Sequence, residues 1–140
     1  MQAVRGGLLA TVALLTLGFA PAHALPEEAA ESNSLHLTVS SGDDHTSSII
    51  GTLLHCDPPR GHSHAAEACK ELAAADGDIA RIPVKPDVVC SMIYAPVTAS
   101  ASGEWGGRQV EYSRTFSNSC VMDAETGSVF ALSDSSEPSD

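Results

Sequence analysis

The stretch from Cys90 to Pro96, Cys-Ser-Met-Ile-Tyr-Ala-Pro, carries the residue types in this chain best suited to a chemical role. A cysteine stands two residues before Met92, Ile93 follows, and a proline closes the segment. Exposed apolar segments of this kind are easily cut by proteases. If Cys90 is bridged to another part of the chain, the segment becomes a substrate-like loop. A protease can bind such a loop, but cleavage of it gains the protease little. The spacing therefore predicts a binding loop rather than a catalytic group.

The alternatives to a binding loop are core packing and catalysis. Met92 and Ile93 also fit simple core packing at the start of a strand, and spacing alone leaves this open. For catalysis, the sequence holds neither the Gly-x-Ser-x-Gly elbow of a serine hydrolase nor the His-Glu-x-x-His of a metalloprotease. The acidic pairs Glu27-Glu28 and Asp43-Asp44 fall in a predicted leader and a predicted turn. We predict that the chain is not an enzyme and uses no cofactor.

Residues 1–24 differ in kind from the rest of the chain. Arg5 gives an early positive charge, residues 6–19 are apolar, and Ala22-His23-Ala24 is a small-x-small cleavage site, which together indicate a signal peptide. The apolar run is shorter than the roughly 20 residues that span a bilayer. We therefore expect a secreted, extracellular protein that does not bind a membrane.

The rest of the chain divides into a leader, a domain and a tail. Residues 25–33 are acidic without a periodic apolar face, which predicts a mobile leader, and residues 133–140 predict a disordered acidic tail. Residues 34–132 suit one domain. The full chain has a formal charge of −11, and loss of Arg5 with the signal peptide lowers it by one unit to −12. Nucleic acid is excluded as a partner because polyanion binding needs a basic surface.

Four cysteines follow the expected signal peptide: Cys56, Cys69, Cys90 and Cys120. An even number in a small exported domain indicates two disulfides, and three pairings can be drawn. Proximity along the chain favours Cys56–Cys69 together with Cys90–Cys120. A zinc site is the rival, since His55, His62 and His64 lie near the first two cysteines, but the close-set cysteine pairs of structural zinc sites are missing. We predict no metal, with His62 and His64 on the solvated surface.

Hydrophobic alternation predicts several strands and one good helix. The predicted strands are residues 34–40, 47–56, 94–102, 108–116 and 127–132. An alanine-rich segment from His64 to Ala75 predicts a helix ended by Asp76-Gly77, and a short helical turn is predicted at Val121 to Glu125. The glycines around Trp105 predict a hairpin turn with this tryptophan as a packing residue. The order predicts an α+β fold, an antiparallel sheet with a helix on one face.

Several motifs occur together in one order along the chain. They are Gly61-His62-Ser63-His64 after Cys56, Val89-Cys90-Ser91-Met92-Ile93-Tyr94-Ala95-Pro96, Gly103-Glu104-Trp105-Gly106-Gly107, and Phe116-Ser117-Asn118-Ser119-Cys120. On these motifs the chain resembles the Streptomyces subtilisin inhibitor family, which are secreted bacterial inhibitors of serine proteases. The resemblance covers most of the chain after the signal peptide.

The resemblance implies a five-stranded antiparallel sheet with a helix on one face, a second short helix, and disulfides Cys56–Cys69 and Cys90–Cys120. It also implies a homodimer built through the sheet and a reactive bond between Met92 and Ile93. The implied reactive loop further contains Val89, Cys90, Ser91, Tyr94, Ala95 and Pro96. Hydrogen bonds from the Asn118 side chain would support this loop.

Met92 is long, unbranched and apolar, which suits a roomy hydrophobic specificity pocket. The expected partners are therefore subtilisin-like serine proteases, with chymotrypsin-like enzymes as a second class. The predicted function is that of a secreted inhibitor that binds in a substrate-like manner. A non-inhibitory extracellular binding module with the same fold is the alternative.

Overall fold

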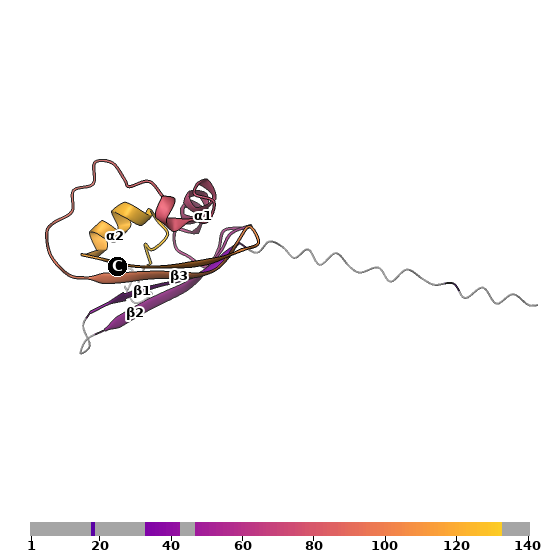
Figure 1. The fold of residues 1–140 in the computed structure, drawn as a ribbon, viewed down its shortest axis with the longest axis horizontal. Helices are drawn as coiled ribbons and strands as arrows, with labels where there is room; N and C mark the ends of the chain where they lie inside the picture. The colour runs from indigo at the N-terminus through magenta and orange to yellow at the C-terminus, as the bar shows by residue number, and fades with distance from the viewer. Residues whose placement is uncertain (1–17, 19–32, 43–46, 133–140) are drawn as a thin grey trace, which may run out of the picture.

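The computed structural model describes residues 18, 33–42 and 47–132. Within these residues the sheet is antiparallel, with the strand order β2-β1-β3-β4. The strands are β1 (Ser34–Ser41), β2 (Ser48–His55), β3 (Val97–Trp105) and β4 (Arg108–Phe116). The helices are α1 (Ala65–Ala74), the short 3-10 helix η1 (Ile79–Arg81) and α2 (Ser119–Thr126). Figure 1 shows α1 and α2 on the same face of the sheet, so the fold is α+β as predicted.

The sheet has one apolar face and one hydroxyl-rich face because side chains alternate along each strand. Leu35 and Leu37 of β1 are fully buried in a core that also contains residues of both helices. On the opposite face the hydroxyls of Thr98 and Thr115 lie 2.7 Å apart across β3 and β4. The helices therefore cover only the apolar face, and the hydroxyl-rich face carries no helix among the described residues (Figure 1).

Asn33 is part of the fold, although the sequence places it at the end of the acidic leader. Its side chain donates a hydrogen bond to the Asp57 carboxylate at 3.2 Å and accepts one from the Gly106 N–H at 2.8 Å. Its carbonyl accepts from the Cys56 N–H at 2.9 Å. Apart from Gly18, the predicted signal peptide, the rest of the leader and the predicted tail lie outside the described residues.

The predicted hairpin between the last two strands is formed, but its turn is tighter than expected. Gly106 and Gly107 make the turn with φ angles of 56° and 74°, a region that favours glycine. Trp105 consequently pairs with Arg108 in the ladder and is buried, as predicted for a packing residue. β3 is shifted by three residues from the predicted strand, so residues 94–96 lie outside the sheet.

The fifth strand predicted at residues 127–132 is wrong, because the described sheet has four strands. Alternation requires every second side chain to be buried, yet the adjacent residues Val129 and Phe130 are both buried. Gly127 has a φ of 61°, and a Cβ there would collide with the Glu71 carboxylate. The chain therefore turns after α2 and fills the core, where the Phe130 ring stacks on Tyr112 with centroids 5.8 Å apart.

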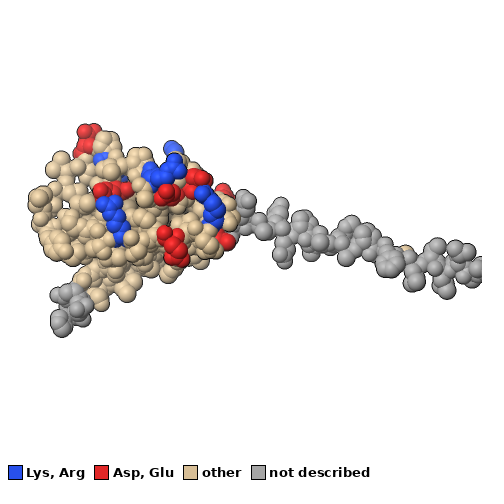
Figure 2. Space-filling model, in the orientation of Figure 1, with Lys and Arg blue, Asp and Glu red and all other residues tan. Residues whose placement is uncertain are grey.

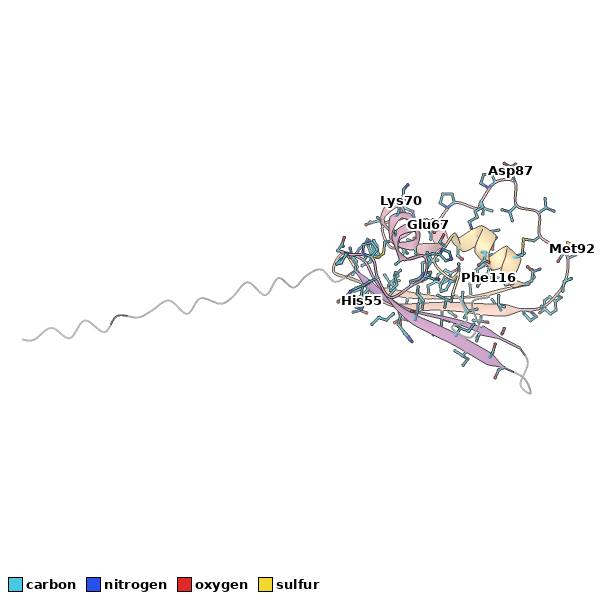
Figure 3. The ribbon with its side chains drawn as sticks, turned by 180° about the vertical axis from the view of Figure 1, so that it is seen from behind. His55, Glu67, Lys70, Asp87, Met92 and Phe116 are labelled. Carbon is cyan, nitrogen blue, oxygen red and sulfur yellow. A yellow bond between two sulfur atoms is a disulfide. The ribbon has the colours of Figure 1, made fainter. Side chains whose placement is uncertain are left out.

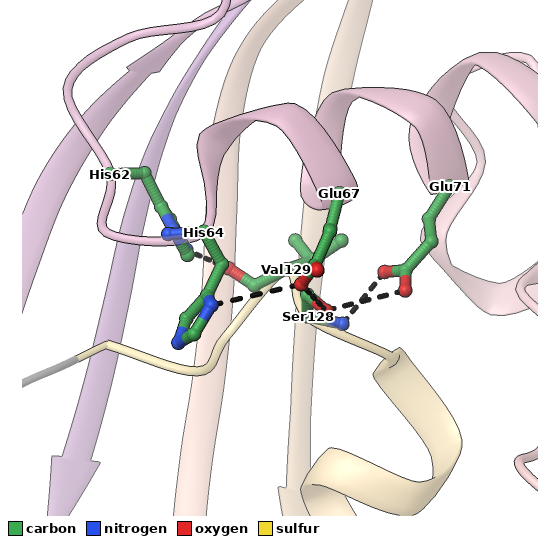
Figure 4. A network of polar contacts seen from close by, with 6 residues as sticks. All are labelled: His62, His64, Glu67, Glu71, Ser128 and Val129. Carbon is green, nitrogen blue, oxygen red and sulfur yellow. Dashed lines mark hydrogen bonds and ion pairs between the residues drawn. The ribbon is translucent and has the colours of Figure 1, made fainter.

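A polar network holds these turns against α1 in place of a strand ladder (Figure 4). The Ser128 N–H donates to a Glu71 carboxylate oxygen at 2.6 Å, and His62 Nε2 lies 3.0 Å from the Val129 carbonyl. His62 Nδ1 accepts a hydrogen bond from the His64 backbone N–H at 2.8 Å. Nδ1 is therefore unprotonated, and the neutral ring donates from Nε2 to Val129. His62 is thus a half-buried structural residue rather than the solvated one predicted.

Acidification is expected to destabilise the fold through His62. Burial lowers the pKa of this imidazole below its usual 6.5, and the nearby His64 adds to the effect, while the hydrogen bond to Val129 opposes it. The folded state thus binds the proton less readily than the unfolded chain, so the contribution of His62 to stability is complete above pH 6.5 and is lost as the pH falls through the lowered pKa. Urea unfolding at about pH 7 and about pH 5 measures this loss.

A His62→Gln variant is the control for this titration, because other groups also titrate between the two pH values. Its free energy of unfolding should fall less on acidification than that of the wild type. An equal fall in both proteins would show that His62 is not responsible.

Candidate functional site

Residues 82–96 leave η1, pass around the outside of α2 and return to the sheet at the start of β3 (Figure 1). Met92 lies at the end of the domain opposite His55 (Figure 3). Met92 is 99% exposed, and Ile93 is 67% exposed. The structure therefore excludes the alternative in which these two residues are core residues at the start of a strand.

The loop concentrates the exposed large apolar side chains of the described residues. They are Val84, Val88, Val89, Met92, Ile93 and Tyr94 in the loop, with Ile49 and Leu53 on β2. No charged residue occurs from Val88 to Gly103. Figure 2 shows the charged side chains gathered over the body of the domain, while the loop end of this face is largely uncharged. Exposed apolar side chains gathered in one loop are characteristic of interaction sites.

The loop is fastened to the beginning of α2 by covalent and hydrogen bonds. Cys90 forms a disulfide with Cys120 in the first turn of α2. The Ala95 N–H donates a hydrogen bond of 2.8 Å to the Ser117 carbonyl, just before the helix. These ties lie on opposite sides of Met92 and Ile93, so the exposed pair is fixed at both ends.

Asn118 joins the two sides of the loop through one buried amide. Its Nδ2 donates to the Ser91 carbonyl at 3.2 Å and to the Ile93 carbonyl at 2.8 Å. Its Oδ1 accepts from the Val121 N–H at 3.0 Å, which caps the N-terminus of α2. The same side chain thus braces the carbonyls before and after Met92 and orders the helix that carries the disulfide. We refer to Ser117, Asn118 and Cys120 as the α2 clamp.

The α2 clamp is itself fixed because α2 is packed on the sheet. Met122 is buried in the core, and Glu125 forms an ion pair of 3.1 Å with Arg114 of β4. The Lys85 N–H donates to the Ala124 carbonyl at 2.8 Å, which ties the approach to the loop to the same helix. The loop is therefore held on a rigid element.

One carboxyl group in α2 has a buried oxygen that makes no hydrogen bond to the described residues. Asp123 Oδ1 is buried and has no hydrogen-bond partner among the described residues. Burial raises the pKa of this carboxyl above its usual value, and Lys85 nearby opposes the shift. The folded state therefore holds the Asp123 proton more tightly than the unfolded chain, so this group favours folding less as the pH rises through the raised pKa.

The second disulfide, Cys56–Cys69, lies away from the loop and joins the end of β2 to α1. With both bonds formed, none of the four cysteines is free. The two bonds are those that the family resemblance implies. Since the sulfurs of Cys56 and Cys69 bond to each other, they are not thiolate ligands for the neighbouring histidines.

Sequence reasoning did not identify every contact that holds the loop. Ser117 and Lys85 act through their backbone carbonyl and N–H groups, and a residue's type gives no signal for such contacts. Asn118 was found only through the family resemblance. The residues predicted for the loop, Val89 to Pro96, do lie together in one irregular segment over the α2 clamp.

An exposed apolar loop that is braced on both sides by a disulfide and hydrogen bonds fits a protein that presents a segment to a partner. Comparison with known proteins agrees with this class. The model of the "Subtilisin inhibitor-like" family matches residues 31–118. The chain belongs to the subtilisin inhibitor-like family, which confirms the resemblance drawn from the sequence.

Individual relatives share both sequence and fold. A Streptomyces avermitilis protein named as a serine protease inhibitor is 58% identical over 133 residues, which cover 95% of this chain and 88% of that protein. The subtilisin inhibitor of Streptomyces albogriseolus is 41% identical, over 71% of this chain and 72% of its own. Streptomyces caespitosus sermetstatin, solved in complex with Bacillus licheniformis subtilisin, superposes with a TM-score of 0.58 at 36% identity, over 71% of this chain and 97% of sermetstatin.

Proposed function

We propose that this protein is a secreted inhibitor of subtilisin-like serine proteases and that Met92–Ile93 is its reactive bond. The observation that carries the proposal is a fully exposed methionine in a loop braced on both sides by the α2 clamp. A serine protease binds an extended segment through its backbone and places one side chain in its specificity pocket. The long, flexible, apolar side chain of Met92 suits a roomy apolar pocket.

Bracing on both sides explains inhibition in place of rapid cleavage. The loop is already ordered before it binds, so binding to the protease costs little further conformational entropy. After cleavage, the disulfide at Cys90 would hold the Ser91 side of the cut. Hydrogen bonds between Ile93 and Asn118 and between Ala95 and Ser117 would hold the other side. The new amine would remain beside the acyl group it left, which favours re-formation of the bond over release.

The proposal extends to partners and location. Chymotrypsin-like proteases are a second class of partner, because their specificity pocket is also apolar. Export after removal of residues 1–24 would bring the inhibitor to extracellular proteases. The family resemblance implies a homodimer through the sheet, and the uncovered hydroxyl-rich face is the surface on which we expect it. Among the described residues, none of the helices has the length and apolar character that crossing a membrane requires.

Titration with subtilisin at near-equal concentrations tests the proposed function. Inhibition predicts a linear loss of protease activity that ends near one inhibitor chain per enzyme. The competing function, a non-inhibitory binding module with this fold, predicts undiminished protease activity with steady cleavage of the added protein.

Replacing Asn118 separates support of the loop from capping of the helix. Asn118→Asp keeps an oxygen to accept from the Val121 N–H but removes the donors to Ser91 and Ile93. With two hydrogen bonds worth about 0.5 to 1.5 kcal/mol each, the inhibition constant should rise about five- to a hundred-and-fiftyfold. Hydrolysis of Met92–Ile93, followed by mass spectrometry, should become faster, while α2 keeps the oxygen that caps its N-terminus.

Asn118→Ala is the matched control because it removes the cap as well. Loss of an N-cap costs about 1 kcal/mol of stability. This variant should therefore lose both potency and melting temperature. If Asn118→Asp inhibits as tightly as the wild type, the amide does not support the loop.

A further inference from the structure

We propose that the Met92 sulfur is a modification site at which a peroxide switches off inhibition reversibly. The inference rests on the proposed function, since it assumes that Met92 enters a protease pocket. The inference adds a means of regulation to that function. An apolar specificity pocket would accept other apolar side chains, which lack an oxidisable sulfur.

Exposure makes Met92 the preferred target among the described oxidisable side chains. Met92 is 99% exposed, whereas Met122 is 3% exposed in the core. All four cysteines are joined in disulfides, so no thiol competes for the oxidant. Trp105 is also buried. Met1, the other methionine of the chain, belongs to the predicted signal peptide and lies outside the described residues.

The reaction is a two-electron oxygen transfer from a peroxide to the thioether. The Met92 sulfur donates an electron pair to one peroxide oxygen, the O–O bond breaks, and a sulfur–oxygen bond forms. The sulfur is oxidised to the sulfoxide, and hydrogen peroxide is reduced to water. Methionine sulfoxide is polar, and methionine sulfoxide reductases return it to the thioether.

The fold should survive this change while binding does not. Met92 contributes nothing to the core, and the α2 clamp holds the backbone carbonyls of Ser91 and Ile93 rather than the methionine side chain. In the protease pocket, however, the sulfoxide oxygen would be buried against apolar groups without a partner. We expect the inhibition constant for subtilisin to rise about ten- to a hundredfold, which corresponds to about 1.4 to 2.8 kcal/mol.

The experiment uses the full secreted chain treated with hydrogen peroxide, which is removed before subtilisin is added. Mass spectrometry measures sulfoxide at Met92 and at Met122, and titration of subtilisin measures the inhibition constant. Part of the oxidised sample is then treated with methionine sulfoxide reductases A and B. Circular dichroism reports whether the fold is kept.

Two variants complete the design, and each is compared with its own untreated form. Met122→Leu removes the buried sulfur and should respond to peroxide as the wild type does. Met92→Leu replaces the exposed sulfur with an apolar side chain that peroxide does not oxidise, and its inhibition constant should not change on treatment.

The outcomes separate this inference from the proposed function. Loss of potency that follows the Met92 sulfoxide, is repaired by the reductases and is absent in Met92→Leu supports the inference. Complete Met92 oxidation with unchanged potency, or an equal loss in Met92→Leu, overturns it while leaving the inhibitor function intact. If the untreated wild type fails to inhibit subtilisin, the proposed function itself fails.

Discussion

Replacing both Cys90 and Cys120 by serine should turn this protein from an inhibitor of subtilisin into a substrate. The disulfide holds the loop two residues before Met92, and without it the protease would have to order the segment on binding. A bridge that closes a loop of 30 residues lowers the conformational entropy of the unfolded chain. On the chain-entropy model this contributes about 3 to 4 kcal/mol of free energy. Loss of this restriction from the loop should raise the inhibition constant about a hundred- to a thousandfold.

Cleavage should change together with affinity. Once Met92–Ile93 is cut in the double variant, the new carboxyl end would be held near the α2 clamp by the Asn118 hydrogen bond to Ser91, without a covalent tie. The product would therefore leave, and protease activity would recover with time. Residual activity and mass spectrometry of the fragments, followed over the same period, measure the conversion.

The Cys56–Cys69 bridge provides the matched control. Its removal in a Cys56→Ser/Cys69→Ser variant should cost about 3 kcal/mol of stability on the same model. This bridge joins β2 to α1 and does not touch the loop. Potency should thus be kept wherever the variant is folded. If both double variants lose potency equally, the loss reflects general destabilisation and not release of the loop.

Replacing Met92 by lysine should redirect the inhibitor from subtilisin towards trypsin. A trypsin-like pocket contains a buried acid, which an apolar methionine leaves without a partner. Leaving a buried charge unpaired costs about 2 to 5 kcal/mol of binding free energy relative to pairing it. The inhibition constant for trypsin should therefore fall roughly thirty- to several thousandfold. Inhibition constants for trypsin and subtilisin, measured on the same preparation, report the change.

The stability of the fold should be unaffected by this replacement because Met92 is almost fully exposed. Ile93→Lys is the control, since it places the same charge one residue further along the loop. It should not give comparable inhibition of trypsin. An equal gain in both variants would show that the reactive bond is not Met92–Ile93.

The sequence predicted much of this architecture because its patterns are local. Alternation along β1 and β4 and the alanine-rich run of α1 each follow from neighbouring residues, and the structure has all three elements. Short separations along the chain also favoured the two disulfides that are formed. Apolar residues between a cysteine and a proline likewise predict the loop from Cys90 to Pro96 without any tertiary contact.

The errors arose where distant residues decide the local conformation. Residues 127–132 look like a strand, but Glu71 and His62 bond to their backbone and the core takes up both Val129 and Phe130. Residues 94–96 look like the start of a strand, but Ala95 bonds to Ser117 instead of a neighbouring strand. Such contacts join residues far apart along the chain and leave no periodic signal.

By itself the sequence determined the class of fold, the cysteine pairs that chain proximity favours, and the apolar loop residues, since composition and short spacings encode these features. Only the tertiary structure decided that Met92 faces solvent and that a single buried amide, Asn118, reaches the carbonyls on both sides of it. The physical reason is that bracing a loop requires α2 and residues 82–96 to be brought together by the core, and many local sequences could satisfy that geometry.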